Sequence, residues 1–343
     1  MLTPKERLNR VLNKEKTDRP PCICPGGMMN MVIAEIMEQE GITFPEAHMD
    51  ALMMADLAAA VYETGCFENY GVPFCMTIEA EDFGAKVDMG TNIYEPHVVE
   101  YAIESVKEWK NASAISFHKG RGKVVIDAIK LLKAKGGDVP IIGNLTGPIS
   151  TASSIMEPVV FYKELRKSNN EAHEFLEFVT AQLILFAKKQ IEAGADIIAI
   201  SDPSGTGEIL GPKLFEEFVV KYINHIVEEM QKENIPTIVH ICGQMKNVYP
   251  QVNRIKSDVL SFDSIVSISE ARRNLGDRLL MGNVSTYAIE FADTKKISEL
   301  TQKCVEDGSD IIAPACGLGM KSTLKNVKAI RKALIKGEET IHA

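Results

Sequence analysis

The chain has 343 residues, of which 45% are hydrophobic and 25% are charged, a composition typical of globular proteins. Its formal net charge of −9 gives no reason to expect nucleic acid or an anionic membrane as a partner, and no apolar run is long enough to cross a bilayer. Seven cysteines, an odd number without a secretion signal, favour a reducing cytoplasm over a disulfide framework.

The first expected element is a short helical segment within about residues 1–19. Thr3 stands at the N-cap position, Pro4 falls in the first turn, and Glu6 completes the pattern of a capping box. We therefore expect the helix to begin directly after Thr3.

Eight apolar runs then alternate with longer amphipathic stretches. The amphipathic stretches include 122–135, 158–193 and 214–230, and the region 61–100 is the least regular and is expected to carry an insertion. Strands that alternate with helices predict a parallel α/β fold, and eight of them predict a (β/α)8 TIM-type barrel in a single domain, 1–343. The expected strands are 20–26, one within 66–80, 139–144, 196–202, 236–242, 258–264, 279–284 and 310–316.

Polar side chains end several of these otherwise apolar strands. Active sites of such barrels lie at the C-terminal ends of the strands, so we expect substrate-binding residues there. For Asn144 and Asp202 the alternative is helix capping, and for Asp263 it is a fourth metal ligand or a plain barrel residue. The residues expected to bind substrate are Asn144, Asp202, Asp263 and Asn283.

A soft metal-ligand set stands at two of the strand ends. His240 and Cys242 are two residues apart on a strand and therefore point to the same side, and Cys316 ends the last strand. One imidazole and two thiolates suit zinc and leave its fourth position open, as in catalytic sites. The alternative is a buried core histidine with buried core cysteines. We predict that His240, Cys242 and Cys316 are both the zinc ligands and the catalytic residues.

The ligand types also point to a reaction. Two thiolates and a neutral histidine cancel the charge of zinc, so a bound water is a poor acid, whereas a substrate thiol is a good fourth ligand. Zinc lowers the pKa of such a thiol while its sulfur remains nucleophilic. The predicted reaction is alkylation of a small thiol.

Seven motifs along nearly the whole chain resemble one family. In order they are RPPCICPGGMMN, GNLTGPIST, SDPSGTGEILGP, HICG, SFD, MGNVS and APACGLG. Together they resemble the methylcobamide:coenzyme M methyltransferases within the uroporphyrinogen decarboxylase superfamily. The resemblance implies a (β/α)8 barrel and zinc held by His240, Cys242 and Cys316. It also implies a methyl-corrinoid donor on a separate protein that docks at the barrel mouth, and a thiol acceptor such as coenzyme M.

Three alternatives remain open at this point. The decarboxylases of the superfamily grip substrate carboxylates with arginines after the first strand, where this chain reads PGGMMNMV without any arginine. A different acceptor, a folate or homocysteine, would need the same zinc. A binding protein for a corrinoid or tetrapyrrole would not need an open His-Cys-Cys set.

Several further residues have no firm role from sequence. Met28, Met29 and Met31 are expected to show ordinary helix packing, with a flexible corrinoid-facing rim as the alternative. Glu79 and Glu81 lie near the expected mouth without an assignable function, and Cys22 and Cys24 are expected in the core of the first strand.

Overall fold

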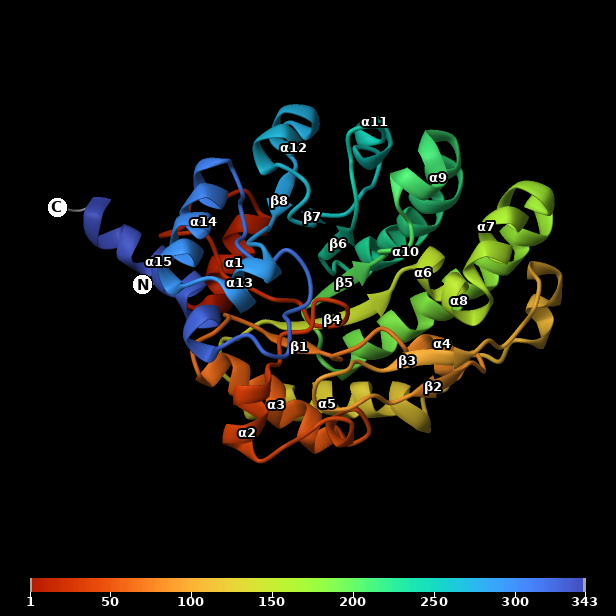
Figure 1. Ribbon diagram of the computed structural model, residues 1–343, viewed down its shortest axis with the longest axis horizontal. Coiled ribbons are helices and arrows are strands. Elements are labelled where there is room, and N and C mark those ends of the chain that lie inside the picture. The colour runs from red at the N-terminus through yellow and green to blue at the C-terminus, as the bar shows by residue number, and fades with distance from the viewer. Residues whose placement is uncertain (1, 342–343) are drawn as a thin grey trace.

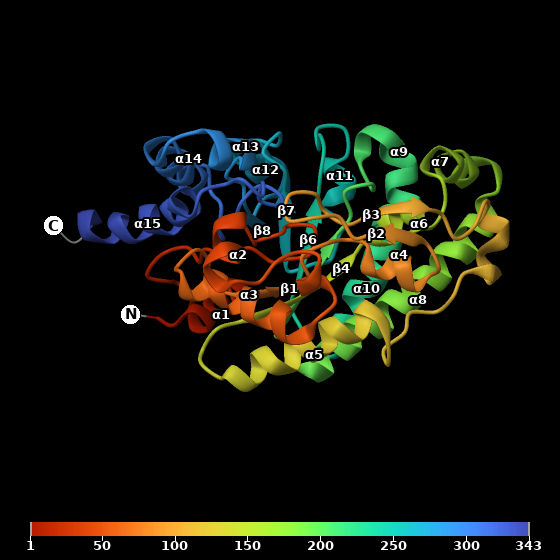
Figure 2. The same cartoon turned by 60° about the horizontal axis from the view of Figure 1, so that its bottom comes forward.

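The computed structural model describes the backbone of residues 2–341 and the side chains of residues 2–335. Its central sheet is parallel, and hydrogen bonds join the strands in the order β1-β4-β5-β6-β7-β8. Figures 1 and 2 show this sheet curved inside a layer of helices. The six strands are β1 (Tyr70–Val72), β4 (Ile141–Thr146), β5 (Ile197–Ser201), β6 (Thr237–Ile241), β7 (Val259–Phe262) and β8 (Leu279–Met281).

Two further segments close the sheet into a barrel. Residues 310–316 bridge to the end of β8, and Cys22 in residues 20–26 forms a parallel bridge with Ile312. On its other side the backbone N–H of Glu68 donates to Cys22 O at 2.8 Å, just before β1. The predicted α/β barrel with eight strand positions is therefore confirmed, although the first and last positions form isolated bridges. Prolines at 20, 21, 25 and 314 explain this, because proline has no N–H to donate to a ladder.

Side chains replace the missing ladder bonds along this seam, by which we mean residues 20–26 with their neighbours 68–72 and 310–316. The Asn69 side chain accepts from Cys24 N at 2.9 Å and donates to Cys24 O at 2.8 Å, as a paired backbone would. The Glu68 carboxylate accepts from Cys22 N at 2.9 Å and from the guanidinium groups of Arg7 and Arg19. Buried carboxylate and buried guanidinium groups thus satisfy each other at the foot of the barrel.

Helices surround the sheet and connect its strands. The first begins as expected, with the Thr3 and Glu6 capping box in place. The expected stretch 158–193 is divided at Ser168 into α7 and α8. The α-helices are α1 (Pro4–Leu12), α2 (Ala34–Glu40), α3 (Ala51–Glu63), α4 (Ile78–Asp82), α5 (Gly120–Lys135), α6 (Pro148–Ile155), α7 (Pro158–Lys167), α8 (Asn169–Ala193), α9 (Gly207–Leu214), α10 (Lys221–Lys232), α11 (Tyr249–Val252), α12 (Ile268–Leu275), α13 (Thr286–Phe291), α14 (Thr294–Glu306) and α15 (Leu324–Ile341).

The irregular region after β1 contains an added hairpin. There β2 (Lys86–Asp88) and β3 (His97–Glu100) pair antiparallel and form a separate two-stranded sheet. Short helices of other types lie elsewhere: the 3-10 helices η1 (Glu46–His48) and η2 (Val106–Asn111), and the π-helix η3 (Phe215–Val220) between α9 and α10. The hairpin is consistent with the insertion expected within residues 61–100.

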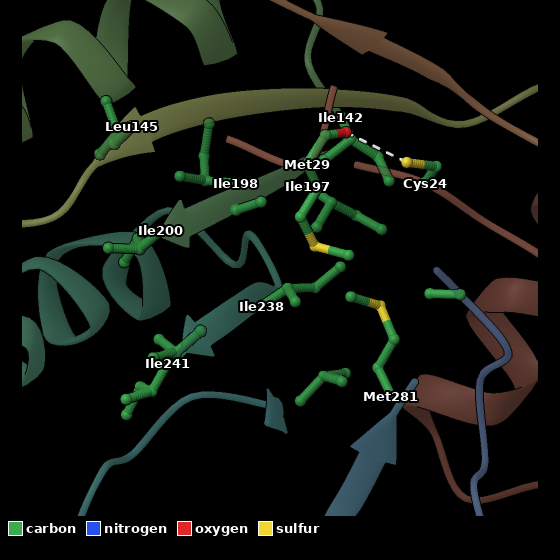
Figure 3. Close-up of a cluster of buried hydrophobic side chains, with 14 of the residues drawn as sticks. Cys24, Met29, Ile142, Leu145, Ile197, Ile198, Ile200, Ile238, Ile241 and Met281 are labelled. Carbon is green, nitrogen blue, oxygen red and sulfur yellow. Dashed lines mark hydrogen bonds between the residues drawn. The ribbon is translucent and has the colours of Figure 1, made fainter. Parts of the chain in front are cut away.

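The core is filled mainly by branched aliphatic side chains from the strands, with sulfur-containing residues between them. Figure 3 shows isoleucines of β4, β5 and β6 beside Cys24, Met29 and Met281. Cys22 and Cys24 are buried, so their expected core roles are confirmed. Met29 and Met31 are buried too, but the expectation that they pack in a helix is wrong, because α2 begins only at Ala34. Among the described residues, no helix has the length and apolar character that a membrane crossing requires.

Replacing Asn69 should test how far the seam depends on its side chain. Asn69→Ala removes two hydrogen bonds and leaves both backbone groups of Cys24 buried without partners, so the free energy of unfolding should fall by about 2–4 kcal/mol. Asn9→Ala, at an exposed position of α1, should change it by less than about 0.5 kcal/mol. Chemical denaturation measures both, and equal effects would show that Asn69 does not hold the seam.

Candidate metal centre

The centre of the site is built at the end of β6. His240 is the fourth residue of the strand and is buried, and its Nε2 lies 3.3 Å from Sγ of Cys242. Because side chains alternate along a strand, residues two apart face the same side, as the sequence indicated. Cys242 follows the end of β6 and is half-buried.

Cys316 reaches the same place from the other end of the sheet. Its loop is held by the 26–31 segment, since Leu318 N donates to Asn30 O at 2.8 Å. Gly317 packs so closely there that a Cβ would lie 2.6 Å from Met28 O, which leaves room only for glycine. The ligand atoms of His240, Cys242 and Cys316 all lie within 4.8 Å of one another. Ends of the fifth and eighth strand positions, which are not neighbours, therefore meet across the mouth.

The donor set fits a tetrahedral zinc ion. Zinc–sulfur bonds of about 2.3 Å and zinc–nitrogen bonds of about 2.0 Å separate neighbouring ligand atoms by roughly 3.5–3.8 Å. Here the distance from Nε2 of His240 to Sγ of Cys242 is 3.3 Å and no two of the three ligand atoms are more than 4.8 Å apart, a range that includes this spacing. The three residues could hold the ion and leave one tetrahedral position toward the mouth.

Electrostatics of the two thiols also favour a cation. The interaction between the two neighbouring thiols holds the pKa of Cys316 below its usual range and raises the pKa of Cys242. The pair therefore retains one proton when no cation is bound, because two thiolates this close repel each other. A divalent ion between them would stabilise both as thiolates.

Ser261 sets the orientation of the histidine. Its buried Oγ lies 2.9 Å from Nδ1 of His240, and the two residues are register partners on β6 and β7. If Nδ1–H donates to this hydroxyl, the lone pair of Nε2 faces the two thiols, which is the tautomer that a metal ligand requires. Ser261 could not be identified from sequence, because the pairing register of two strands is not visible in either strand alone.

Of the four residues expected to bind substrate, Asp263 is the one nearest the thiols. It follows β7, is half-buried, and lies close enough to Cys242 for its charge to disfavour ionisation of that thiol. One carboxylate oxygen accepts from Ile265 N at 3.0 Å. That Asp263 binds substrate beside the open metal position stays a prediction.

The other three engage the protein's own groups. Asn144 donates to Pro25 O and Val72 O at 2.8 and 2.9 Å, and Asn283 donates to Asp263 O at 2.9 Å. Asp202 is fully buried and accepts from the first turn of α6, including Ser150 N at 2.7 Å. These contacts brace strands and cap a helix, so helix capping is confirmed for Asp202. Substrate contact by these three side chains remains a prediction without a supporting contact.

Comparison with known proteins places the chain among enzymes. It matches the uroporphyrinogen decarboxylase (URO-D) family over residues 3–336. The methylcobamide:CoM methyltransferase MtbA of Methanosarcina acetivorans is 33% identical over 318 residues, which cover 92% of this chain and 93% of the relative. A uroporphyrinogen decarboxylase of Myxococcus xanthus is 27% identical over 290 residues, covering 81% and 80%. A solved methyltransferase structure from Methanosarcina mazei superposes with a TM-score of 0.91, 30% identity and full coverage of both chains.

Near the mouth, a second polar cluster is formed by residues that lie between β1 and β4 along the chain. Arg121 of α5 is buried and donates to Glu81, to Thr77 and to Sγ of Cys75. Glu81, which had no role from sequence, is therefore its ion-pair partner. Because a buried guanidinium needs a charged partner and several acceptors, this cluster explains how the segment after β1 is held.

Glu79 is buried in the same region, and no ion pair to it is recorded among the described residues. Its carboxylate accepts from Thr146 N at 2.8 Å and from Thr146 Oγ1 at 3.0 Å. Burial away from water raises the pKa of Glu79 to about 7, and these hydrogen bonds offset only part of that shift. The folded protein therefore holds a proton on Glu79 under conditions in which the unfolded chain has released it.

This raised pKa predicts a pH-dependent stability. Between the ordinary pKa of 4.5 and the folded value of about 7, ionisation increasingly favours the unfolded state, and above pH 7 the loss is complete. Glu79→Gln removes that loss, so its effect on the free energy of unfolding should be more favourable at pH 8 than at pH 5 by about 2–3 kcal/mol. Denaturant titrations at both pH values measure this. Glu38→Gln, at an exposed site, should show almost no such difference, and an equal effect of Glu79→Gln at both pH values would contradict the assignment.

Proposed function

The chain belongs to the uroporphyrinogen decarboxylase family and, within it, to the methylcobamide:CoM methyltransferases, and we propose that it moves a methyl group from a methyl-corrinoid to a small thiol, on one domain spanning residues 1–343. The observation that carries this proposal is the convergence of His240, Cys242 and Cys316 at the barrel mouth. We propose zinc as the ion and a thiol such as coenzyme M as the acceptor. Thiolate ligands persist in a reducing compartment, and we place the reaction in the cytoplasm.

Bound zinc would lower the pKa of the acceptor thiol and hold its sulfur as a thiolate at neutral pH. The protein's own residues supply the rest of the arrangement. Ser261 orients His240, and the Asn30–Leu318 backbone contact fixes the loop of Cys316. Because His240 is buried, the acceptor and the methyl donor are proposed to reach the metal from the mouth of the barrel. Such positioning brings sulfur and methyl carbon together in line.

The donor is proposed to arrive on a corrinoid protein that docks over this mouth. A corrinoid is too large to reach the buried side of the site, so its methyl group must be presented from outside. Large apolar side chains are exposed on segments that follow the strands, which is the same end of the barrel, and such exposure is common at interaction surfaces. They include Tyr94, Ile209, Ile265, Tyr287 and Phe291.

Uroporphyrinogen decarboxylation is the alternative within the same family. That reaction needs cations for several substrate carboxylates, and residues 25–31 after the first strand position contain none. Arg121, a buried arginine near the mouth, already pairs with Glu81. A decarboxylase also has no use for two thiols and an imidazole gathered in one place.

The metal prediction concerns binding rather than turnover. The purified protein should contain about one zinc per chain, and Cys242→Ala or Cys316→Ala should lose it while the barrel stays folded. Ser261→Ala should weaken zinc binding by about 10–100-fold, since the histidine loses its orienting partner. Cys66→Ala, a buried cysteine away from the site, should retain the metal. Competition with a chromogenic chelator measures all four, and full zinc content in both ligand variants would refute the assignment.

The reaction prediction uses free methylcobalamin as the donor. Adding the acceptor thiol should release about one proton per site near pH 7, before methyl transfer, because a thiol of pKa about 8.5 must bind as a thiolate. Thiol-dependent loss of the methyl–cobalt absorbance should follow, and its rate advantage over the uncatalysed reaction should shrink above pH 8.5 or so.

A dye-based proton count on mixing and the absorbance change measure the two steps separately. Tight thiol binding without proton release would contradict activation of the thiol by ionisation. Uroporphyrinogen supplied to the same protein should give no coproporphyrinogen, and its formation would favour the decarboxylase alternative.

A further inference from the structure

An exposed aromatic pair lies on α13, the helix that follows β8 at the mouth end of the barrel. The side chains of Tyr287 and Phe291 are 74% and 67% exposed, and their ring centroids are 4.8 Å apart. They stand four positions apart on the helix, so they share one face, where their rings contact each other. Two large rings left in water on one helical turn are typical of an interface rather than of a free surface.

This helix is fixed to the loop that carries Cys316. Ala315 N donates to Val284 O at 2.8 Å just before α13 begins. The carboxylate of Glu290 lies against Gly319, so a Cβ there would force this side chain to move. Asn326 of α15 donates to the carbonyl oxygens of Ile289 and Ala292, which secures the end of α13. A partner seated on the aromatic pair would therefore contact a helix that is joined to the loop of the metal ligand.

Exposed lysines lie at the start of the two helices that adjoin α13. Lys295 and Lys296 begin α14, and Lys321 and Lys325 lie at the start of α15, next to Asn326; all four are exposed. Figures 1 and 2 show α13, α14 and α15 gathered at one edge of the molecule. We call Tyr287 and Phe291 with these four lysines the basic–aromatic corner.

Three acidic groups lie in the same segments. The Asp293 side chain caps α14 by accepting from Lys296 N, Glu290 is half-buried against Gly319, and Glu299 lies 3.8 Å from Lys296. In the described part of the chain no ion pair is recorded for Lys295, Lys321 or Lys325. Four lysines against these three carboxylates leave the corner positive on a chain of net charge −9, and this local charge favours encounter with an acidic partner.

We propose that the basic–aromatic corner is the docking surface for an acidic face of the protein that carries the methyl-corrinoid. This inference rests on the proposed function and adds where the corrinoid protein docks and which sign of charge its docking face carries. A second copy of this chain is disfavoured as the occupant, because each copy carries the same net negative charge and the same basic corner. The aromatic rings would supply the buried anchor, and the lysines would supply the rate of encounter and its dependence on salt.

The test compares two donors, free methylcobalamin and a corrinoid protein charged with methylcobalamin that the wild-type chain demethylates. The double variant Tyr287→Ser/Phe291→Ser should raise KM for the protein donor at least about tenfold and leave turnover of free methylcobalamin unchanged. Lys295→Glu/Lys325→Glu should also raise KM and should flatten the dependence of kcat/KM on ionic strength.

Matched controls carry comparable changes elsewhere. Leu185→Ser alters an exposed apolar residue on α8, and Lys163→Glu alters an exposed lysine on α7, across the barrel from the corner (Figure 1). Both should keep the wild-type KM for the protein donor. An unchanged KM in the corner variants, an equal increase in the controls, or a wild-type enzyme that accepts free methylcobalamin but no methyl-corrinoid protein would overturn the docking proposal. Failure of the wild type with free methylcobalamin would instead refute the proposed function.

Discussion

Closure of the barrel across its proline-containing seam is the constraint on which the site depends. Without closure, residues 310–316 would lie at one edge of an open sheet, and Cys316 would be separated from His240 by the width of β7 and β8. Prolines deprive the seam of ladder donors, and the Asn69 amide and the Glu68 carboxylate supply substitutes. The geometry of the metal ligands is therefore determined partly by side chains far from them in sequence.

Stability and chemistry are separated along the barrel axis. At the foot, Glu68 is buried among Arg7, Arg19 and a backbone N–H, so each charge has several partners. Removing one member of such a network leaves an uncompensated buried charge, which is far more damaging than the loss of an exposed pair. At the mouth, by contrast, half-buried thiols and a nearby carboxylate lack a full set of partners, as expected where a ligand completes the arrangement.

The mouth also combines two kinds of recognition. Small, soft ligand atoms at its base select a metal and a sulfur nucleophile, while the rim presents aromatic rings and lysines at the scale of another protein. Both are attached to the same loop, because α13 packs on Gly319 and Cys316 stands three residues before it. Docking and chemistry are thereby placed within one rigid part of the fold.

Much of this could be predicted from local sequence. The alternation of apolar runs indicates the barrel, the spacing of His240 and Cys242 places both on one strand face, and the residues around Thr3 specify the start of α1. Ordered motifs over nearly the whole chain indicate the family. These features depend on residues within a few positions of one another, or on a chemical type alone, and so they can be read without coordinates.

Other features were decided only by the tertiary structure. Helix capping was one expectation for Asp202, and only the position of α6 shows which helix its carboxylate caps. Ser261 meets His240 because β6 and β7 pair in one particular register. Cys316 joins them only because the barrel closes. In each case the contact joins segments far apart in the chain, and its distance is set by packing and closure, which no local pattern encodes.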